Sequence, residues 1–183
     1  MSCVPGGLPI TEVLAVGADL EWLGQAIEVR MTDYIQPGTN IAPPPAPPLP
    51  SGPDAWADLV RDIADEDRLI LALTIAPYLA PEKLDVFLTK HAVFDRRFTE
   101  FGGVIGRAHG GLLPTAETAR FLLAGGHIGK RVAFQQRLSP SGALLRRGLI
   151  RLDHQSPDEP PLSARLVATE TTLNAALSLP PTT

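Results

Sequence analysis

Cysteine is almost absent from this chain of 183 residues, which contains only Cys3. One thiol cannot form a disulfide or a cysteine zinc site within the chain, so the fold must depend on its apolar core. This cysteine usage is typical of a reducing compartment, and we expect a cytoplasmic protein. Aromatic residues are scarce at 5%, but the apolar fraction of 44% is enough to build one hydrophobic core.

Long apolar runs are missing too. No stretch approaches the roughly 20 apolar residues that span a bilayer. The first residues, Met1 to Gly6, also lack the charged and apolar regions of a signal peptide. The sequence therefore predicts no membrane partner.

Motifs for catalysis and nucleotide binding are missing as well. Residues 125–131 resemble a phosphate loop, but Ala124 stands where its first glycine is needed and Arg131 where a hydroxyl should reach magnesium. Residues 102–106 fail the dinucleotide fingerprint, because Phe101 takes the place of the leading glycine. The histidines show no metal-ligand spacing, and no serine lies in a nucleophile context. We expect no catalytic residue, no metal site and no cofactor in these 183 residues.

Charge is present but unevenly distributed. The net charge is only -4, yet residues 96–151 contain ten basic residues against two acidic ones. Such a segment favours a basic face that meets a protein or a nucleic acid. Its arginines can equally pair with the acidic residues of the chain's own segment 54–67. The sequence leaves these alternatives open.

The first third of the chain predicts a helix followed by a linker. Apolar residues recur at helical spacing from Thr11 to Ile35, with Asp19 among the acids on the opposite side. This helix either packs on its own domain or docks on a partner. Residues 36–53 are too rich in proline for a helix or an inner strand, so they predict an extended linker of polyproline character. The alternative is that this segment engages a groove lined with aromatic residues.

The rest of the chain favours a domain of helices followed by a β-hairpin. The predicted helices begin at Asp54 and Asp65, with Pro77 bending or ending the second, and continue with residues 82–90, 115–124 and 128–138. Thr115 or Thr118 is the expected cap of the helix that ends at Ala124. Residues 144–152 and 162–169 are the predicted strands of the hairpin.

This order of elements is that of a winged helix, with the hairpin as its wing. We therefore predict a mainly α fold with a small β-hairpin, in which a winged-helix-like domain follows an N-terminal helix and a proline-rich linker. The predicted units are an N-terminal helical segment (1–35), the linker (36–53), the winged-helix-like domain (54–172) and an exit helix and linker (173–183).

The stretch from Phe94 to Ala124 is rich in glycine and arginine and has little regular periodicity. We expect an irregular connector between helices, anchored by Phe94, Phe98, Phe101, Leu112 and Leu113. Exposed polar residues of this stretch and the basic residues after it are the candidate partner contacts. They are Arg96, Arg97, Glu100, Arg107, His109, Lys130, Arg131, Arg146 and Arg147.

Three runs carry a resemblance to a known family: DRLILAL (67–73), FTEFGG (98–103) and GGLLPTAET (110–118). Together they resemble the N-terminal winged-helix region of bacterial AAA+ ATPases. These ATPases are encoded with extracellular contractile injection systems of the antifeeding-prophage and Photorhabdus virulence cassette type. The resemblance covers about residues 54–170.

The resemblance implies a domain that recruits or orients components or cargo of an injection particle. In that family an ATPase module follows, which would bind ATP and Mg²⁺ and form a ring. These 183 residues contain no Walker A or Walker B motif. The resemblance therefore implies an excised N-terminal region or a stand-alone adaptor, and no ATPase residue transfers to this chain.

Two functions remain from the sequence. The preferred one is a non-catalytic protein-interaction domain of an AAA+ ATPase, with particle components or cargo as partners. The alternative, with nucleic acid as the partner, is a winged-helix DNA-binding regulator. It would place residues 115–124 or 128–138 in a groove, with Arg146 and Arg147 on phosphates.

Overall fold

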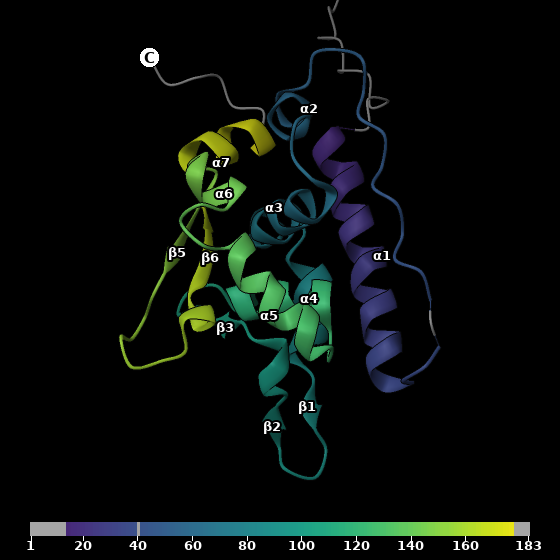
Figure 1. Cartoon of the computed structure of the whole chain (residues 1–183), viewed down its shortest axis with the longest axis vertical. Helices are drawn as coiled ribbons and strands as arrows, with labels where there is room; N and C mark the ends of the chain where they lie inside the picture. The colour runs from purple at the N-terminus through teal and green to yellow at the C-terminus, as the bar shows by residue number, and fades with distance from the viewer. Residues whose placement is uncertain (1–13, 40, 178–183) are drawn as a thin grey trace, which may run out of the picture.

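The structure, a computed structural model, describes residues 14–39 and 41–177 of the chain. As predicted, it is mainly helical with small antiparallel hairpins (Figure 1). The α-helices are α1 (Ala15–Ile35), α2 (Ala55–Val60), α3 (Asp65–Leu79), α4 (Ala116–Ala124), α5 (Ile128–Arg137), α6 (Ala143–Arg146) and α7 (Glu170–Leu177). Short 3-10 helices are η1 (Pro81–Leu88), η2 (Thr99–Phe101) and η3 (Pro161–Ser163).

Local signals explain where several helices begin. The Asp54 side chain accepts a hydrogen bond of 2.8 Å from the Ala57 N–H and so caps α2. Thr115 caps α4 in a capping box with Thr118, as the sequence predicts. Pro77 does not end α3 at its own position, because the helix continues to Leu79. The predicted helix over 82–90 is instead the 3-10 helix η1, which begins at its proline.

The strands form three separate two-stranded antiparallel hairpins in the described chain. Their bounds are β1 (Lys90–His91), β2 (Arg96–Arg97), β3 (Val104–Ile105), β4 (Leu112–Leu113), β5 (Ile150–Asp153) and β6 (Arg165–Ala168). Strands β2, β3 and β4 lie within the stretch predicted to be irregular, and β1 lies just before it. Each of these strands is only two residues long, which is too short to leave a period in the sequence.

The predicted strand over 144–152 is wrong in its first half. Leu144 lies in α6, and β5 starts only at Ile150. Gly148 separates the two with a φ of 63°, a left-handed conformation that glycine adopts without strain. Arg146 and Arg147 therefore lie at the end of a short helix and not at the start of the hairpin.

The order α3, β4, α4, α5, β5, β6 is the order that a winged helix requires. The residues just after β4 pair with β6, so they lie beside the β5–β6 hairpin, which is the wing. Thr115 forms an antiparallel bridge with Arg165, and the Leu166 N–H donates to the Pro114 carbonyl at 2.9 Å. The start of α4 is thereby fixed against β6.

Helix α1 shares the hydrophobic core of the domain. Its apolar residues, among them Leu23 and Ile27, belong to the same buried cluster as α3 and α4. The apolar face of α1 is thus occupied by the protein itself. Asp19, expected on the exposed side, is instead fully buried, because it pairs with Arg68 of α3 and accepts a hydrogen bond from Trp56.

The proline-rich segment is extended, as expected, and runs back along the outside of α1 (Figure 1). It is not a free spacer, since the Trp22 indole N–H donates a hydrogen bond of 2.9 Å to the Pro44 carbonyl. Ala46 and Leu49 pack against the hydrophobic core. One aromatic residue of the same chain, Trp22, therefore contacts this segment, and the alternative that the segment engages a groove lined with aromatic residues stays a prediction.

Some expectations fall outside the described residues. These are Cys3, the first residues of the helix predicted from Thr11, and the exit linker with the end of the exit helix, residues 178–183. Within the described chain, the exit helix is α7, which begins at Glu170 and not at Leu173.

Candidate interaction surfaces

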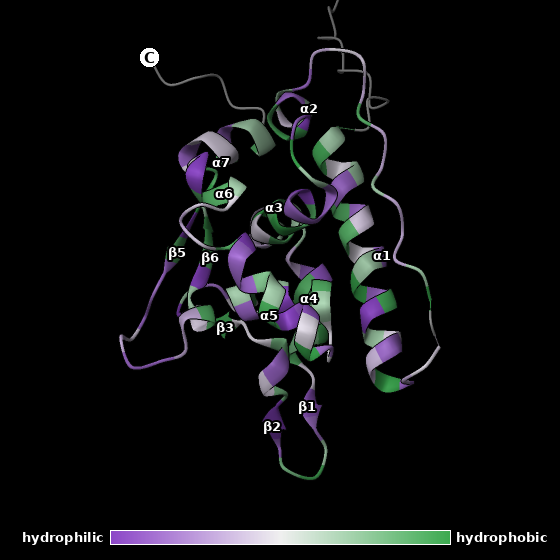
Figure 2. Ribbon diagram, viewed as in Figure 1, coloured by the Kyte–Doolittle hydropathy of each residue, from purple (hydrophilic) through white to green (hydrophobic). Residues whose placement is uncertain are grey.

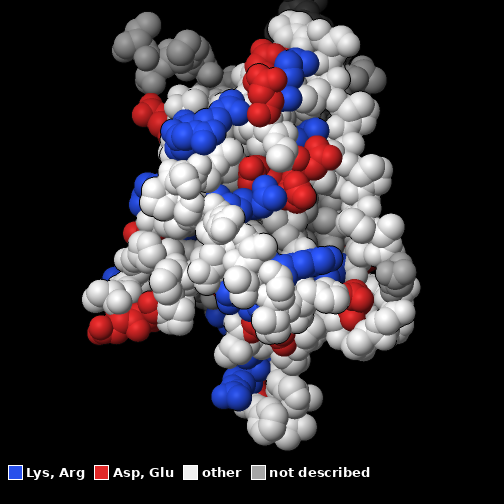
Figure 3. All heavy atoms as spheres, viewed as in Figure 1, with Lys and Arg blue, Asp and Glu red and all other residues white. Residues whose placement is uncertain are grey.

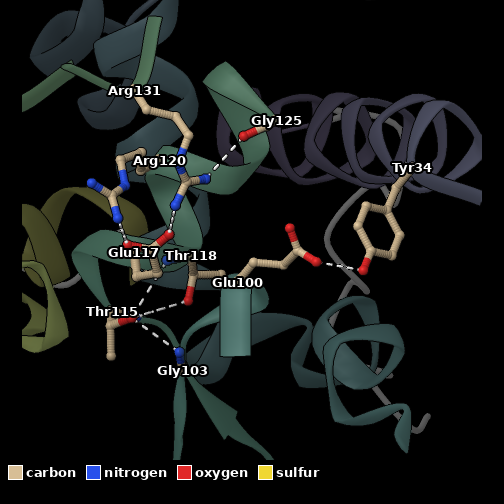
Figure 4. Close-up of polar contacts among 9 residues, drawn as sticks. All are labelled: Tyr34, Glu100, Gly103, Thr115, Glu117, Thr118, Arg120, Gly125 and Arg131. Atoms are coloured by element: carbon tan, nitrogen blue, oxygen red, sulfur yellow. Dashed lines mark hydrogen bonds and ion pairs between the residues drawn. The ribbon is translucent and has the colours of Figure 1, made fainter. Parts of the chain in front are cut away.

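One predicted contact residue, Arg131 of α5, is engaged inside the protein. Glu117 accepts hydrogen bonds from both Arg120 and Arg131, one guanidinium on each carboxylate oxygen (Figure 4). The Arg131 guanidinium also donates to the Gly125 carbonyl at 2.9 Å, at the C-terminal end of α4. Arg131 thus shares one carboxylate with Arg120, which leaves a net charge of +1 on the three side chains, and it fastens α5 to α4.

Other basic residues of the 96–151 segment are similarly occupied. Arg137 on α5 binds Asp67 of α3, with 2.8 Å between Nη1 and Oδ1. Arg147 donates to the carbonyls of Leu59 and Asp62, both at 3.4 Å, and so touches the loop after α2. Figure 3 accordingly shows acidic and basic side chains interspersed over the visible face, with no continuous basic surface there.

The glycines of the connector have a structural role. Gly102 and Gly103 both have positive φ, 61° and 76°, and the Gly103 N–H donates to the Thr115 side chain at 3.0 Å (Figure 4). A Cβ on Gly102 would lie 2.6 Å from Thr115 Oγ1 and 2.8 Å from the Thr118 nitrogen. The glycines therefore let the connector approach the N-terminus of α4 closely. Arg97 donates to the Gly103 carbonyl at 2.9 Å and holds the same turn.

Glu100 is a link between the connector and α1. Its carboxylate accepts a hydrogen bond from the Tyr34 hydroxyl (Figure 4). The Tyr34 ring packs edge-on against Phe98, Phe101 and Phe121, with 5.2 Å between the ring centroids of Tyr34 and Phe101. Burial, together with the bond to Glu100, raises the pKa of Tyr34 to about 12.

His109 packs over its own loop. A Cβ on Gly111 would come within 2.9 Å of His109 Nε2, so the imidazole lies against that glycine. In the described part of the chain, no cluster of three or more acidic, histidine or cysteine side chains could hold a metal ion.

The pKa of Asp153, in the wing, lies below its ordinary value because Arg165 donates hydrogen bonds to its carboxylate.

The β1–β2 hairpin, which we call the finger (residues 90–97), projects from one end of the molecule (Figure 1). Its strands are hydrophilic and the loop that joins them is hydrophobic (Figure 2). Val93 is 79% exposed and Phe94 is 64% exposed. Phe94 was expected to be a core anchor, and that prediction is wrong because the hairpin carries its tip beyond the core.

Charged and aromatic groups surround the tip of the finger. The Arg96 guanidinium lies 5.7 Å from the centroid of the Phe94 ring, and the His91 ring lies 4.7 Å from it. Lys90 pairs with Asp95 at 3.1 Å, in a turn where Asp95 has a φ of 46°. An exposed aromatic ring beside an arginine is the composition that dominates binding energy at many protein interfaces.

A second exposed apolar surface lies on α5. Ile128 is 73% exposed and Val132 is 66% exposed, one helical turn apart, while Phe134 on the opposite side is buried. Lys130, two residues from each of them, is exposed on a different side of the helix. Val93, Ile128 and Val132 were not predicted as surface contacts, although the spacing of four between Ile128 and Val132 is typical of one face of a helix.

The nine predicted contacts therefore separate into two groups. Arg96, Arg107, Lys130, Arg146 and Arg147 are exposed, whereas Arg97, Glu100, His109 and Arg131 are partly buried and hold internal contacts. The exposed ones do not converge on one site: Arg96 belongs to the finger, Lys130 to α5, and Arg146 to the end of α6.

A cavity of about 520 Å³ lies between the connector and the loop of the wing. It is lined by Arg97, Phe98, Thr99, Gly102, Gly103, Val104, Thr115, Glu117, Gln155, Glu159, Pro160 and Ser163. Its side chains include no arrangement of nucleophile, base and orienting group.

Within the described residues, no helix has both the length and the apolar character needed to cross a membrane.

Comparisons of the chain with protein-family models, with curated proteins and with solved structures each found no match.

Proposed function

We propose that this chain is a non-catalytic protein-interaction domain, which recruits or recognises other proteins through its finger and the exposed face of α5. The observation that carries the proposal is on α5. This helix presents Ile128 and Val132 to solvent while Arg131 and Arg137 are bound to acids of the same chain. Exposed apolar side chains in pairs on rigid elements are suited to protein contacts.

The energetics support a protein partner. Burying a valine or isoleucine side chain stabilises a complex by roughly 1.5–3 kcal/mol. Two such residues on α5, and Val93 with Phe94 on the finger, could supply much of the energy of a moderate-affinity interface. The internal ion pairs of Arg131 and Arg137 hold α5 in place, so little ordering cost is expected on binding.

The resemblance noted in the sequence extends the proposal to a biological role. The chain would be the N-terminal recruitment or substrate-recognition domain of an AAA+ ATPase that serves a contractile injection system in the cytoplasm. Components or cargo of the injection particle would be its partners. ATP and Mg²⁺ would bind only in an ATPase module outside these 183 residues, and ring formation would depend on that module.

A second candidate function is DNA binding. Helices α4 and α5 followed by the β5–β6 wing have the order of a winged-helix DNA-binding domain, and Lys130, Arg146 and Arg147 are exposed. Against it, Arg131 and Arg137, two of the three cations of α5, pair with acidic residues of the same chain. Contacts of free cations with phosphates supply most of the affinity for DNA.

The two functions are separated by binding experiments. Purified chain immobilised on a resin should retain purified injection particles or their cargo from the same genome. Retention of neither, together with normal particle assembly and loading in a strain that lacks the region, would contradict the proposal. In a fluorescence anisotropy titration with duplex DNA, a DNA-binding regulator would show affinity that falls about 10³-fold or more between about 50 and 200 mM salt. We expect no such binding.

A further inference from the structure

The proline-rich segment binds its own helix by a recognition mode known from protein complexes. We define residues 41–50 as the strap. Trp22 of α1 donates its indole N–H to the Pro44 carbonyl at 2.9 Å. Pro44, Ala46, Pro47 and Leu49 of the strap are half-buried, and the other strap residues are exposed.

The chemistry of this contact is that of polyproline recognition. A proline-rich strand has no N–H to donate at its prolines, but its carbonyls remain free to accept. Grooves that bind such strands offer aromatic rings and donors such as an indole N–H. Trp22 supplies both, and the Arg68 guanidinium, 5.7 Å from the ring centroid, holds the indole from the side of the core. Arg68 is itself fixed by Asp19 at 2.8 Å.

The groove continues beyond the strap. A cavity of about 570 Å³ borders it, with one wall from the strap and the others from α1, α3, α4 and the start of α5. Its apolar lining includes Trp22, Ala26, Val29, Leu69, Leu122 and Leu123. The volume is within the usual range for sites that bind small ligands or peptide side chains.

The strap is attached more weakly than the helices around it. Among the described residues 41–53, only Pro44 shares a hydrogen bond with the rest of the fold. The end of the strap is fixed independently, because Asp54 caps α2 and accepts a hydrogen bond of 3.1 Å from the Ala15 N–H. The strap can therefore lift from α1 while Asp54 stays in place, since a half-buried segment with one hydrogen bond to the rest of the fold opens at a lower free-energy cost than a buried helix.

We propose that the Trp22 groove is a polyproline-binding site, which the strap occupies in the free protein and which a proline-rich segment of a partner protein enters by displacing the strap. The strap then acts as a built-in competitor that lowers the apparent affinity for the partner segment. This inference is independent of the proposed function, because it concerns α1 and the strap and uses neither the finger nor the exposed face of α5.

The test uses the strap sequence itself as the probe. In a first variant, the six prolines of the strap (Pro43, Pro44, Pro45, Pro47, Pro48 and Pro50) are replaced by serine. A synthetic peptide, IAPPPAPPLP with blocked ends, is titrated into this variant. Binding is followed by the two indole N–H resonances in an NMR spectrum, those of Trp22 and Trp56.

Trp56 is an internal control. Its indole N–H donates to Asp19 Oδ2 at 2.8 Å in the buried core, and it is linked to Trp22 through Asp19 and Arg68. We expect the peptide to move the Trp22 resonance to its position in the unaltered chain and to move that of Trp56 much less. Isothermal titration calorimetry gives the affinities that this resonance cannot report. By this measurement the unaltered chain should bind the peptide at least about tenfold more weakly than the variant, because its own strap competes at millimolar effective concentration. Trp22→Phe in the variant should abolish the heat of binding.

Three results would overturn the inference. One is a folded variant whose Trp22 resonance does not respond to several millimolar peptide. Another is equal binding with and without the native strap. The third is a concentration-dependent dimer of the unaltered chain in sedimentation, abolished by the strap replacement, since the occupant would then be a second copy. If circular dichroism shows that the first variant has lost its helices, the unaltered chain decides: the absence of any heat of binding in a calorimetric titration with excess peptide contradicts the proposal.

Discussion

Arg68 and Asp19 form a buried ion pair that joins α3 to α1, with 2.8 Å between Arg68 Nε and Asp19 Oδ2 and a second bond from Nη2 to Oδ1. The side chain of Asp19 is fully buried and that of Arg68 is 6% exposed. The indole N–H of Trp56, in α2, donates a further hydrogen bond to the Asp19 carboxylate. Three elements, α1, α2 and α3, thus meet at one carboxylate.

This relationship predicts a large effect of Asp19→Ala. Removal of the carboxylate leaves a guanidinium buried without a partner, so we expect a loss of about 3–5 kcal/mol in the free energy of unfolding. Urea denaturation followed by circular dichroism measures it. Replacing both partners, Asp19→Leu with Arg68→Met, should cost less than Asp19→Ala, because no buried charge then remains.

The matched control is the exposed pair of Arg61 and Asp58, which are 3.0 Å apart. Asp58→Ala should change stability by less than about 1 kcal/mol, since water screens this pair. Similar losses for Asp19→Ala and Asp58→Ala would show that the buried pair does not hold α1 to the core.

A second prediction concerns Gly102, which has φ 61° and ψ -150°. This conformation is almost restricted to glycine, and an added Cβ would meet the backbone nitrogen of Thr118 at 2.8 Å. Gly102→Ala should therefore destabilise the protein by about 2 kcal/mol or more. Gly110→Ala is the control in the same connector, because a Cβ there meets nothing within 4 Å. A Gly102→Ala variant as stable as Gly110→Ala would refute the close approach to α4.

A third prediction follows from the raised pKa of Tyr34, about 12 in the folded protein against an ordinary value of 10.0. The folded state holds this proton more tightly, so the stabilising effect is complete below pH 10 and is lost as pH rises through about 12. The absorbance of the phenolate, compared between the unaltered chain and Tyr34→Phe, isolates this group. A difference curve with its midpoint near 10 would mean that Tyr34 is not buried against Glu100.

The local features of the fold were predictable from the sequence. Thr115 and Asp54 each precede an apolar helical run, and a cap needs only its own neighbours in the chain. The wing hairpin was predicted for the same kind of reason, since the apolar residues of its two strands flank a polar break. Its start was misplaced because Leu144 and Leu145 are apolar in α6 as they would be in a strand.

Features that depend on distant partners were not predictable. Asp19 and Arg68 lie 49 residues apart, and Arg137 and Asp67 lie 70 apart. Nothing near Asp19 in the chain marks it as buried, so it was placed with the exposed acids. The candidate contacts were mispredicted for the same reason. Arg131 was predicted to be an exposed contact because its ion pair with Glu117 cannot be seen in the sequence.

The proposed function requires that exposed apolar side chains, and not cations, bind the partner. The decisive measurement is the affinity of the Ile128→Ser/Val132→Ser variant for the particle component or cargo that the unaltered chain retains. We expect a loss of at least about tenfold, or 1.4 kcal/mol, with unchanged stability because both side chains are exposed. Lys130→Gln should stay within about threefold of the unaltered chain. An unchanged affinity of the double variant, with a large loss for Lys130→Gln, would contradict the account.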